Sequence, residues 1–304
     1  MITEAVMPKN LLKDRATIEE FLRKGPHRLS AFSFVNIHTW KDFFEFECRT
    51  IDGNLCIFAR HETGCFLYLP PLGETISPRA VLECFRVMDQ TNRNPGISRI
   101  ENVEEEDLRF FPAEQYTHYK KCDEYVYQRD NIAGLKGNSY KSQRSDYNHF
   151  SKNFHYEYLP YNRDMKQECC DLFENWAQER LQGGRDDIYR QMIDDSRIVH
   201  RIILEEGLSL GVIGSVVKVQ GHIKAYTFGF SLNPETFCIL LETADITIKG
   251  LPAFVFSEFC RDTRIEGFRF INVMDDFGLE NIKKTKLSFH PINIVPSYTI
   301  SRKG

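Results

Sequence analysis

One order of predicted elements occurs twice along the chain, and this repetition limits the fold more than any other feature of the sequence. The first half contains three strand-like runs, a helix and a fourth strand, at residues 43–49, 55–59, 65–69, 78–88 and 97–103. The second half contains the same series, at residues 212–219, 223–230, 236–242, 251–259 and 268–273. The repetition predicts an internal duplication.

Individual letters support the duplication. The first two strands of each half flank a two-residue turn, Asp52-Gly53 and Gln220-Gly221, and the two turn glycines lie 168 residues apart. Arg99-Ile-Glu-Asn-Val103 resembles Arg269-Phe-Ile-Asn-Val273 at an offset of 170 residues. The alternative is chance, because this order of elements is common and five letters are few.

Three helical segments are predicted between the halves, at 138–154, 165–176 and 186–204. The first is amphipathic at 100° per residue. Its aromatic face carries Tyr140, Tyr147, Phe150 and Phe154, and its polar face carries Lys141, Arg144, Asn148 and Lys152.

Composition excludes several classes of protein. Of 304 residues, 42% are hydrophobic and 27% charged, which is typical of globular domains and not of disordered or fibrous chains. The net charge of −4 argues against a protein that coats nucleic acid by bulk electrostatics, although a local basic patch remains compatible with it.

The sequence also favours a cytoplasmic location. It has no run of about 18 apolar residues that could span a bilayer, and its first 15 residues lack the apolar core of a signal peptide. The nine cysteines form no CxxC pair, which suits reduced thiols. Neither they nor the scattered histidines have metal-ligand spacing, so we expect no metal site.

Standard catalytic signatures are missing, because the sequence contains no P-loop, no HExxH and no GxSxG. Two basic clusters could instead hold a phosphate-bearing substrate through charge-assisted hydrogen bonds. One is the polar face of helix 138–154, and the other comprises Lys283, Lys284 and Lys286. The alternative for both is a solvated helix face.

Glu242 is the candidate general base. It ends an otherwise apolar run, 237–241, directly before the loop at Lys249-Gly250. A desolvated carboxylate there could accept a proton near neutral pH. The alternative is a strand-end residue that reaches solvent.

Two segments resemble the signatures of one family. Residues 125–130 (YVYQRD) with 137–150 (GNSYKSQRSDYNHF), and residues 271–278 (INVMDDFG) with 283–291 (KKTKLSFHP), are similar to the phosphatidylglycerol lysyltransferase C-terminal domain family. The Pro70-Pro71-Leu-Gly73 turn and Glu242 with Lys249-Gly250 also fit. The resemblance covers about residues 15 to 300.

The resemblance implies a mixed α+β fold made of two tandem acetyltransferase-type (GNAT) folds, each with a largely antiparallel sheet flanked by helices. We place the domains at 1–135 and 136–304, the second including the linking helices at 138–204. Characterised relatives move an amino acid from aminoacyl-tRNA to an amine or a lipid hydroxyl. A small-molecule or peptide acceptor and the acceptor end of a tRNA are therefore the expected partners.

The resemblance also assigns roles to residues. Glu242 or Asp276 would accept the proton. Phosphate or the developing oxyanion would be held by substrate-binding residues, namely Lys141, Arg144, Asn148, Asn272, Lys283 and Lys286. In true acetyltransferases, backbone amides of the loop matched here by Lys249 and Gly250 bind the pyrophosphate of acetyl-CoA.

Pro252 follows that loop in this chain and has no N–H to donate. Acetyl-CoA is therefore a less favoured donor than aminoacyl-tRNA. Three hypotheses remain: an acyl or aminoacyl transferase, a non-catalytic binding module on a duplicated fold, and a coenzyme A–dependent N-acyltransferase.

Overall fold

The computed structural model describes residues 11–182 and 187–303, and its chain forms two compact units. Unit 1 comprises the residues up to Asp123 together with those from Val295 onward, and unit 2 comprises Glu124–Ile294. The two long strands that pass from one unit to the other along the chain are β5 (Tyr116–Gln128) and β11 (Asn293–Arg302).

Unit 1 contains the first copy of the predicted series. Its elements before β5 are η1 (Leu11–Asp14), α1 (Arg15–Leu22), α2 (Phe34–Thr39), β1 (Glu45–Ile51), β2 (Asn54–His61), β3 (Gly64–Leu67), α3 (Pro78–Thr91), η2 (Pro95–Ile97), β4 (Arg99–Glu104) and η3 (Glu105–Phe110). The strands β1, β2 and β3 are antiparallel neighbours, and β4 lies parallel to β3.

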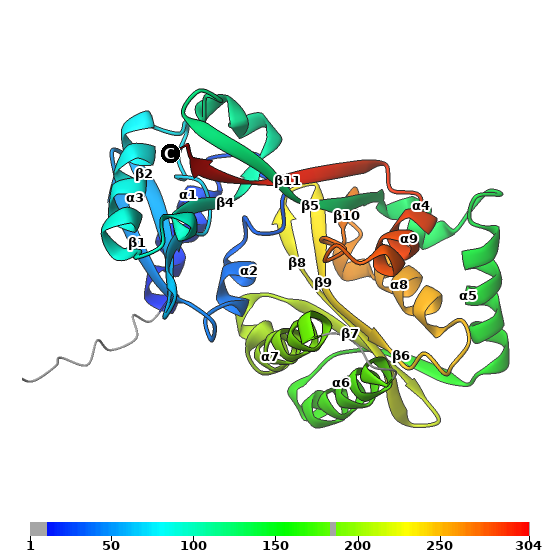
Figure 1. Ribbon diagram of the computed structural model, residues 1–304. Helices are drawn as coiled ribbons and strands as arrows, with labels where there is room; N and C mark the ends of the chain where they lie inside the picture. Colours follow the sequence, from blue (N-terminus) through cyan, green and yellow to red (C-terminus); the bar gives the residue numbers. More distant parts are fainter. Residues whose placement is uncertain (1–10, 183–186, 304) are drawn as a thin grey trace, which may run out of the picture. The chain divides into compact units, whose positions relative to one another are not determined.

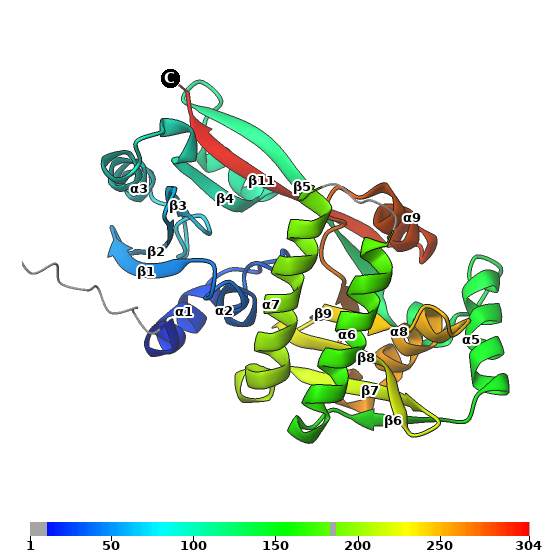
Figure 2. The same cartoon turned by 60° about the horizontal axis from the view of Figure 1, so that its bottom comes forward.

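Helices cover both faces of the unit 1 sheet. Helix α3 packs against β1, β2 and β3, and Figure 2 shows α1 and α2 on the other side of these strands. The first six residues of β2 are accordingly all buried, although only alternate residues of a strand point to one face. The strand therefore reads as a nearly continuous apolar run, LCIFA.

Unit 2 contains the second copy and the helices that precede it. After β5 its elements are α4 (Arg129–Gly134), α5 (Lys141–Asn153), β6 (Tyr156–Pro160), η4 (Arg163–Met165), α6 (Lys166–Leu181), α7 (Asp187–Leu210), β7 (Ile213–Val219), β8 (His222–Asn233), β9 (Thr236–Ala244), α8 (Leu251–Arg261), η5 (Thr263–Ile265), β10 (Phe270–Asn272) and α9 (Glu280–Ser288). Strands β6 to β9 are antiparallel neighbours, and β10 lies parallel to β9.

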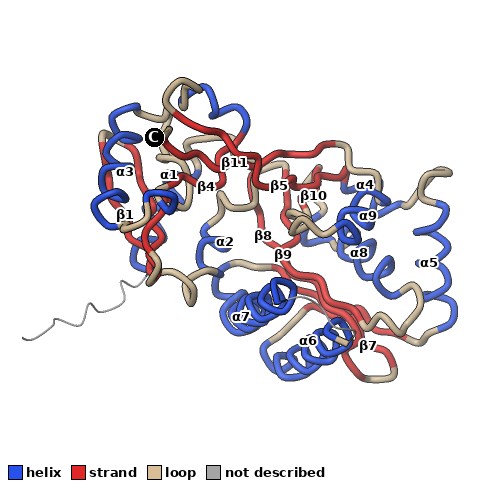
Figure 3. The backbone as a smooth tube through the Cα atoms, in the orientation of Figure 1, coloured by secondary structure: helices blue, strands red, loops and turns tan. Residues whose placement is uncertain are grey.

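The unit 2 sheet separates two layers of helices (Figure 3). Figures 1 and 2 show α6 and α7 side by side on one face of β7, β8 and β9, and α8 on the other. Helix α8 buries Phe254 and Phe259 in two aromatic clusters of the core, with α4 and α5 packed against the helix. On the opposite face, His200 of α7 is buried against the hydroxyl of Tyr226, with 2.7 Å between Nδ1 and the oxygen.

The doubled acetyltransferase-type fold is confirmed, and so are the turns that the sequence predicts. Asp52 and Gln220 have φ values of 48° and 53°, and Gly53 and Gly221 have φ values of 80° and 83°. Positive φ at both central residues is the geometry of the two-residue hairpin whose twist matches its strands. The three predicted linking helices are α5, α6 and α7. Residue 186, where the third was expected to begin, lies outside the described residues.

Each unit takes its last strand from the other repeat. Strand β4 pairs with β11, which follows β10 along the chain, and β10 pairs with β5, which follows β4. The compact units therefore do not coincide with the sequence repeats. The predicted domain boundary after residue 135 concerns the sequence repeats and stays a prediction. The compact units are divided at Asp123/Glu124 and at Ile294/Val295, within the two shared strands.

Five of the α-helices and strands were not predicted from the sequence: α2, α4, β5, β6 and β11. The first half of β5 reads YTHYKKCD and alternates poorly, so its extended conformation depends on pairing with distant strands. All nine cysteines are free thiols, six of them buried. No helix in the described part of the chain is long and apolar enough to cross a membrane.

Replacement of Gly250 by alanine tests the close packing of α5 on α8. Gly250 caps α8 with a φ of 85°, and a Cβ there would lie 2.1 Å from the backbone oxygen of Asp146. We expect Gly250→Ala to lower the free energy of unfolding by about 2–4 kcal/mol, because backbone strain and overpacking add. Gly267→Ala, at a glycine with open space around it, is the control in urea denaturation. Equal stability of the two variants would contradict this packing.

Candidate functional site

A β-bulge in β9 sets the direction of the Glu242 side chain. In the ladder between β8 and β9, Phe228 pairs with Leu241 and Gly229 pairs with Ile239, so Leu240 is an extra residue. In a regular strand, residues 239 and 242 would point to opposite faces of the sheet. The extra residue shifts this alternation by one position, so that both side chains point to the same face. Ile239 packs in the core under α8, and the bulge brings Glu242 to that same face.

Glu242 combines contact with solvent and a desolvated carboxyl group. Its side chain is exposed, yet the surrounding protein desolvates the carboxyl and raises its pKa to about 8. The Thr227 hydroxyl donates to Oε2 at 3.4 Å, and this bond and the charge of Lys286 both oppose the increase in pKa.

Lys286 holds the loop between β10 and α9. Its ammonium donates to the backbone oxygens of Val273 at 2.6 Å and Met274 at 3.1 Å, and to that of Asp275. Met274 has a φ of 60°, a conformation that non-glycine residues adopt only when the surroundings fix it. Desolvation is the main influence on Lys286 and lowers its pKa.

The carboxyl end of α9 is held by side chains from the first family-like segment. The hydroxyl of Tyr127 donates to the Lys286 carbonyl at 2.8 Å, Gln143 Nε2 donates to the Ser288 carbonyl at 2.7 Å, and the hydroxyl of Tyr140 donates to the Phe289 carbonyl at 3.1 Å. The last carbonyls of a helix have no partner within it. The two family-like segments thus form one hydrogen-bonded assembly of β5, α5 and α9.

Two of the predicted phosphate ligands are used inside this assembly. The Arg144 guanidinium donates to the carbonyls of Leu135 and Gly137 at 2.5 and 2.9 Å, which closes the connection between α4 and α5. Lys286 binds the loop as described above. Lys141, Lys283 and Asn148 are exposed. The substrate-binding role of these five residues stays a prediction. The three exposed side chains are the ones that a substrate in solution could contact.

Asp276 and Asn272 have structural partners. Asp276 is buried and accepts from the hydroxyl of Tyr125 at 2.5 Å and from the Gly278 amide at 2.9 Å. Asn272 is fully buried and donates to Glu124 Oε2 at 2.6 Å. Of the two carboxylates predicted as bases, Glu242 is exposed and Asp276 is buried.

The residues at Lys249 and Gly250 do not fit the pyrophosphate of coenzyme A. The backbone oxygen of Asp146 lies against Gly250, where a pyrophosphate would need hydrogen-bond donors. Pro252 lacks an N–H within the first turn of α8. The cofactor role of this loop stays a sequence prediction that the local chemistry does not favour.

The corresponding place in unit 1 is apolar. Counted from the hairpin turn, Thr227 is the fifth ladder position of β8, and Phe58 is the fifth of β2. Glu242 pairs with Thr227, and Leu67 pairs with Phe58. Phe58 and Leu67 are both fully buried. The two repeats have therefore diverged, and the carboxylate of this position belongs to unit 2.

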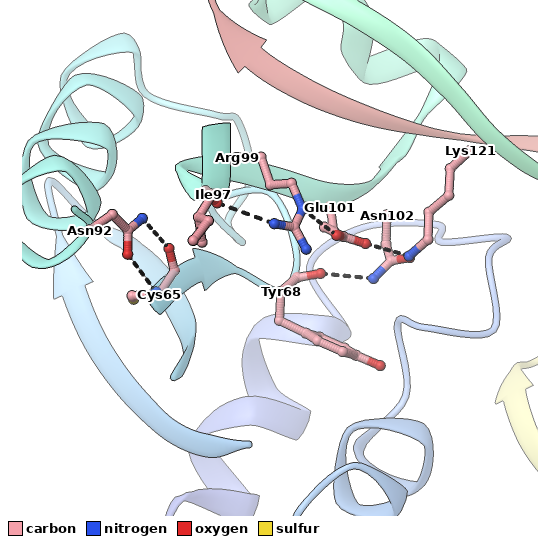
Figure 4. Close-up of polar contacts among 8 residues, drawn as sticks. All are labelled: Cys65, Tyr68, Asn92, Ile97, Arg99, Glu101, Asn102 and Lys121. Carbon is pink, nitrogen blue, oxygen red and sulfur yellow. Dashed lines mark hydrogen bonds and ion pairs between the residues drawn. The ribbon is translucent and has the colours of Figure 1, made fainter. Parts of the chain in front are cut away.

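Unit 1 has its own polar cluster at the strand that matches β10 (Figure 4). Asn102 has a φ of 55° and donates to the Tyr68 carbonyl at 2.9 Å. Glu101 is held between Arg99 and Lys121, whose charges together lower its pKa despite burial. Since each of these groups is paired, the cluster stabilises the bulged end of β4.

Sequence reasoning missed Thr227 and the bulge. Gly229 was a usable signal, because a glycine inside a strand often marks a bulge or a close approach. A Cβ at Gly229 would lie 2.3 Å from the Phe237 ring and 2.4 Å from the Cys238 carbonyl oxygen. No cluster of three His, Cys, Asp or Glu residues that could hold a metal occurs within the described ranges.

One protein family matches most of the chain. The family model described as phosphatidylglycerol lysyltransferase, C-terminal, matches residues 23–301, which include both family-like segments and Glu242. No curated protein matches the chain.

Solved structures agree with the fold. A conserved protein of unknown function from Bacteroides thetaiotaomicron is 27% identical, with a TM-score of 0.84, over 98% of this chain and 99% of that one. L-PGS from Bacillus licheniformis is 17% identical, with a TM-score of 0.66, over 96% of this chain and 92% of that one. A tandem GNAT protein from the clavulanic acid biosynthesis pathway is 8% identical, with a TM-score of 0.50, over 98% of both chains.

The pH dependence of stability tests the pKa of Glu242. The carboxyl ionises near 4.5 without perturbation and at about 8 in the folded protein. Between these values the folded state keeps a proton that the unfolded state has released, so this group destabilises the fold increasingly as the pH rises. Glu242→Gln should therefore match the wild type at pH 4, exceed it in unfolding free energy increasingly up to pH 8, and keep that advantage above pH 8.

The control for this experiment is Glu235→Gln, at an exposed position next to the same strand. It should show no growing advantage between pH 4 and 8 in denaturant titrations. A Glu242→Gln curve parallel to that of the wild type over this range would contradict the raised pKa.

Replacement of Lys286 tests the hold on the β10–α9 loop. Lys286→Met removes hydrogen bonds from one ammonium to three carbonyls, so we expect a loss of about 2–3 kcal/mol in unfolding free energy. Lys284→Met, at the exposed position two residues earlier on α9, should change it little. If both variants unfold at the same urea concentration, Lys286 does not fix the loop.

Proposed function

The chain belongs to the family of phosphatidylglycerol lysyltransferase C-terminal domains, and from that premise we propose that it is an acyl or aminoacyl transferase with Glu242 as general base. Family and fold support the transferase class. The observation that carries the proposal is an exposed carboxylate with a pKa of about 8, which the bulge in β9 places next to Thr227 on the face of the unit 2 sheet that α8 covers. A base with a pKa near the working pH is the most effective one for proton transfer.

The proposed donor is an aminoacyl-tRNA, and the acceptor is an amine or a hydroxyl group. The family name refers to transfer of lysine, and L-PGS from Bacillus licheniformis shares the fold of this chain. The poor fit of coenzyme A at Gly250 and Pro252 also favours an ester donor over a thioester carried by that cofactor.

The chemical step would proceed by addition and elimination at the ester carbonyl. The acceptor nitrogen or oxygen bonds to the carbonyl carbon while Glu242 accepts its proton. The ester C–O bond then breaks, and the departing ribose hydroxyl receives the proton back from Glu242. The Thr227 hydroxyl, which donates to Oε2, would orient the carboxylate toward the acceptor. Most of the rate would come from holding the two reactants together.

A second candidate function is binding without catalysis. One observation favours it: Arg144 and Lys286, the cations expected to hold phosphate or the oxyanion, are engaged with backbone carbonyls. A module of this kind would bind charged tRNA and release it unchanged.

A transfer assay separates these candidates. We expect protein-dependent release of a radiolabelled amino acid from charged tRNA onto hydroxylamine, a small amine that needs no dedicated acceptor site. The protein-dependent rate should rise with pH to a plateau above a midpoint near 8. Glu242→Gln should lower kcat/KM by about 10²–10⁴-fold and remove this midpoint.

Acetyl-CoA and an uncharged tRNA serve as the parallel arms, and Glu235→Gln as the control variant. Binding of charged tRNA without protein-dependent transfer at any pH would favour the binding module. Transfer that survives Glu242→Gln with the same pH midpoint would remove Glu242 from the mechanism while leaving the transferase class in place.

A further inference from the structure

Strand β1 forms the end of the unit 1 sheet. Its strand neighbour in the described part of the chain is β2, and the ladder between them runs without a bulge from Glu45, opposite Arg60, to Ile51, opposite Asn54. The outer edge of a terminal strand can pair with a strand of another chain. Proline and lysine often block such pairing, and the seven residues of β1 include neither.

The strand at the end of the unit 2 sheet is protected. Pro160 ends β6, and the register with β7 continues at Tyr161, whose amide donates to the Gly214 carbonyl at 2.9 Å. Because backbone groups alternate in direction along an antiparallel strand, the backbone of Pro160 faces away from β7. A proline at this position has no N–H to offer to an incoming strand. The two terminal strands therefore differ, and β1 is the one suited to pairing.

The hairpin turn determines which residues of β1 point to the outer edge. Ile51 pairs with Asn54 directly across the two-residue turn. The pair next to such a turn is of the hydrogen-bonded kind, so the odd-numbered residues of β1 bond to β2. The backbone groups of the even-numbered residues, Phe46, Cys48 and Thr50, point away from β2.

The charges of β1 favour one way of pairing two copies of the chain. Glu47 and Arg49 are two positions apart and therefore lie on the same face of the sheet. If two copies pair antiparallel about a twofold axis at Cys48, Glu47 of each copy lies opposite Arg49 of the other. An axis at residue 47 or 49 would instead place two glutamates or two arginines opposite each other.

Both side chains carry their charge at neutral pH. Glu47 accepts from Arg49 Nε at 2.7 Å and from Arg60 Nε at 3.0 Å. Desolvation opposes ionisation of Glu47, but the hydrogen bonds and charges of the two arginines outweigh it and lower the pKa to about 2. The Arg49 side chain is 39% exposed and has further guanidinium donors, so it can reach a second carboxylate.

We propose that β1 pairs with β1 of a second copy of this chain, antiparallel and with the twofold axis at Cys48. Phe46 of each copy exchanges backbone hydrogen bonds with Thr50 of the other, and two pairs of Glu47 with Arg49 lie across the interface. One pair of short strands buries less area than most stable interfaces, so the dimer forms at micromolar concentrations. The interface does not depend on the proposed chemistry of Glu242.

Sedimentation velocity of the full chain at about 5–200 µM tests the proposal. We expect the wild type to shift with concentration toward a species of twice the 35.6 kDa chain mass. Thr50→Pro removes an outward N–H and leaves the ladder to β2 in place, so it should raise the Kd of the dimer about tenfold or more. Arg49→Glu should raise the Kd similarly, because it places carboxylates opposite each other.

Complementary charge changes test the register. Glu47→Lys should also weaken self-association, because it places two cations opposite each other. An equimolar mixture of Glu47→Lys and Arg49→Glu should restore the dimer, since every pair across the interface then has opposite charges. Arg86→Glu changes a 63% exposed side chain on α3 of the same unit and should dimerise as the wild type does. Circular dichroism checks that each variant is folded.

Cys48 gives a direct readout of the axis. In the proposed register the two Cys48 residues are a hydrogen-bonded pair with Cα atoms about 5.5 Å apart, so a short bismaleimide should link their thiols into a covalent dimer. Cys48→Ser should abolish the link. Cys170→Ser, which replaces another partly exposed thiol, should keep it.

Three results would overturn the proposal. One is a wild type that stays monomeric over the whole concentration range. Another is a dimer that survives both Thr50→Pro and Arg49→Glu, which would place the interface elsewhere. The third is a mixture of Glu47→Lys and Arg49→Glu that stays monomeric although both variants are folded.

Discussion

The antiparallel pairing of β5 with β10 is the constraint on which unit 2 depends. It places Tyr125 and Tyr127 beside the end of β10, where their hydroxyl groups reach Asp276 and the Lys286 carbonyl. These two bonds, with the Lys286 ammonium, fix a loop that contains residues in strained conformations. Because β5 follows β4 in the first repeat, the loop between β10 and α9 of the second repeat is held by a strand that the first repeat supplies.

The two repeats share the same order of strands and helix, but they carry different side chains at matched positions of the sheet. At matched ladder positions unit 1 has Phe58 and Leu67, whereas unit 2 has Thr227 and Glu242. Apolar side chains at this place contribute to stability through burial. A desolvated carboxylate at the same place costs stability at neutral pH. The protein tolerates this cost because other parts of the chain stabilise it. The buried Phe58 and Leu67 of the first repeat are among the residues that do so.

The predicted substrate-binding cations fall into two groups, those bonded to backbone carbonyls and those exposed to solvent. Arg144 and Lys286 lie within reach of unpaired carbonyls, so their donors are used inside unit 2. Lys283 and Lys141 are separated from these two residues by only three positions each, and both are exposed. Residues three positions apart lie on nearly the same face of a helix. The different exposure of Lys141 and Arg144, and of Lys283 and Lys286, therefore depends on the groups that surround each side chain and not on the spacing in the sequence.

The sequence by itself determined the repeated order of strands and helix in the two halves, both hairpin turns, the three helices between the halves and the family. These features depend on local conformational preference and on apolar periodicity, which are visible in a single chain. Glu242 was also found as a candidate base, because a carboxylate after an apolar run stands out in the sequence. The pairing of β5 with β10 and of β11 with β4, the bulge at Leu240 and the partners of Arg144 and Lys286 were decided only by the tertiary structure. They depend on contacts between residues distant in sequence, and neither burial nor the direction of a side chain exists before those contacts form.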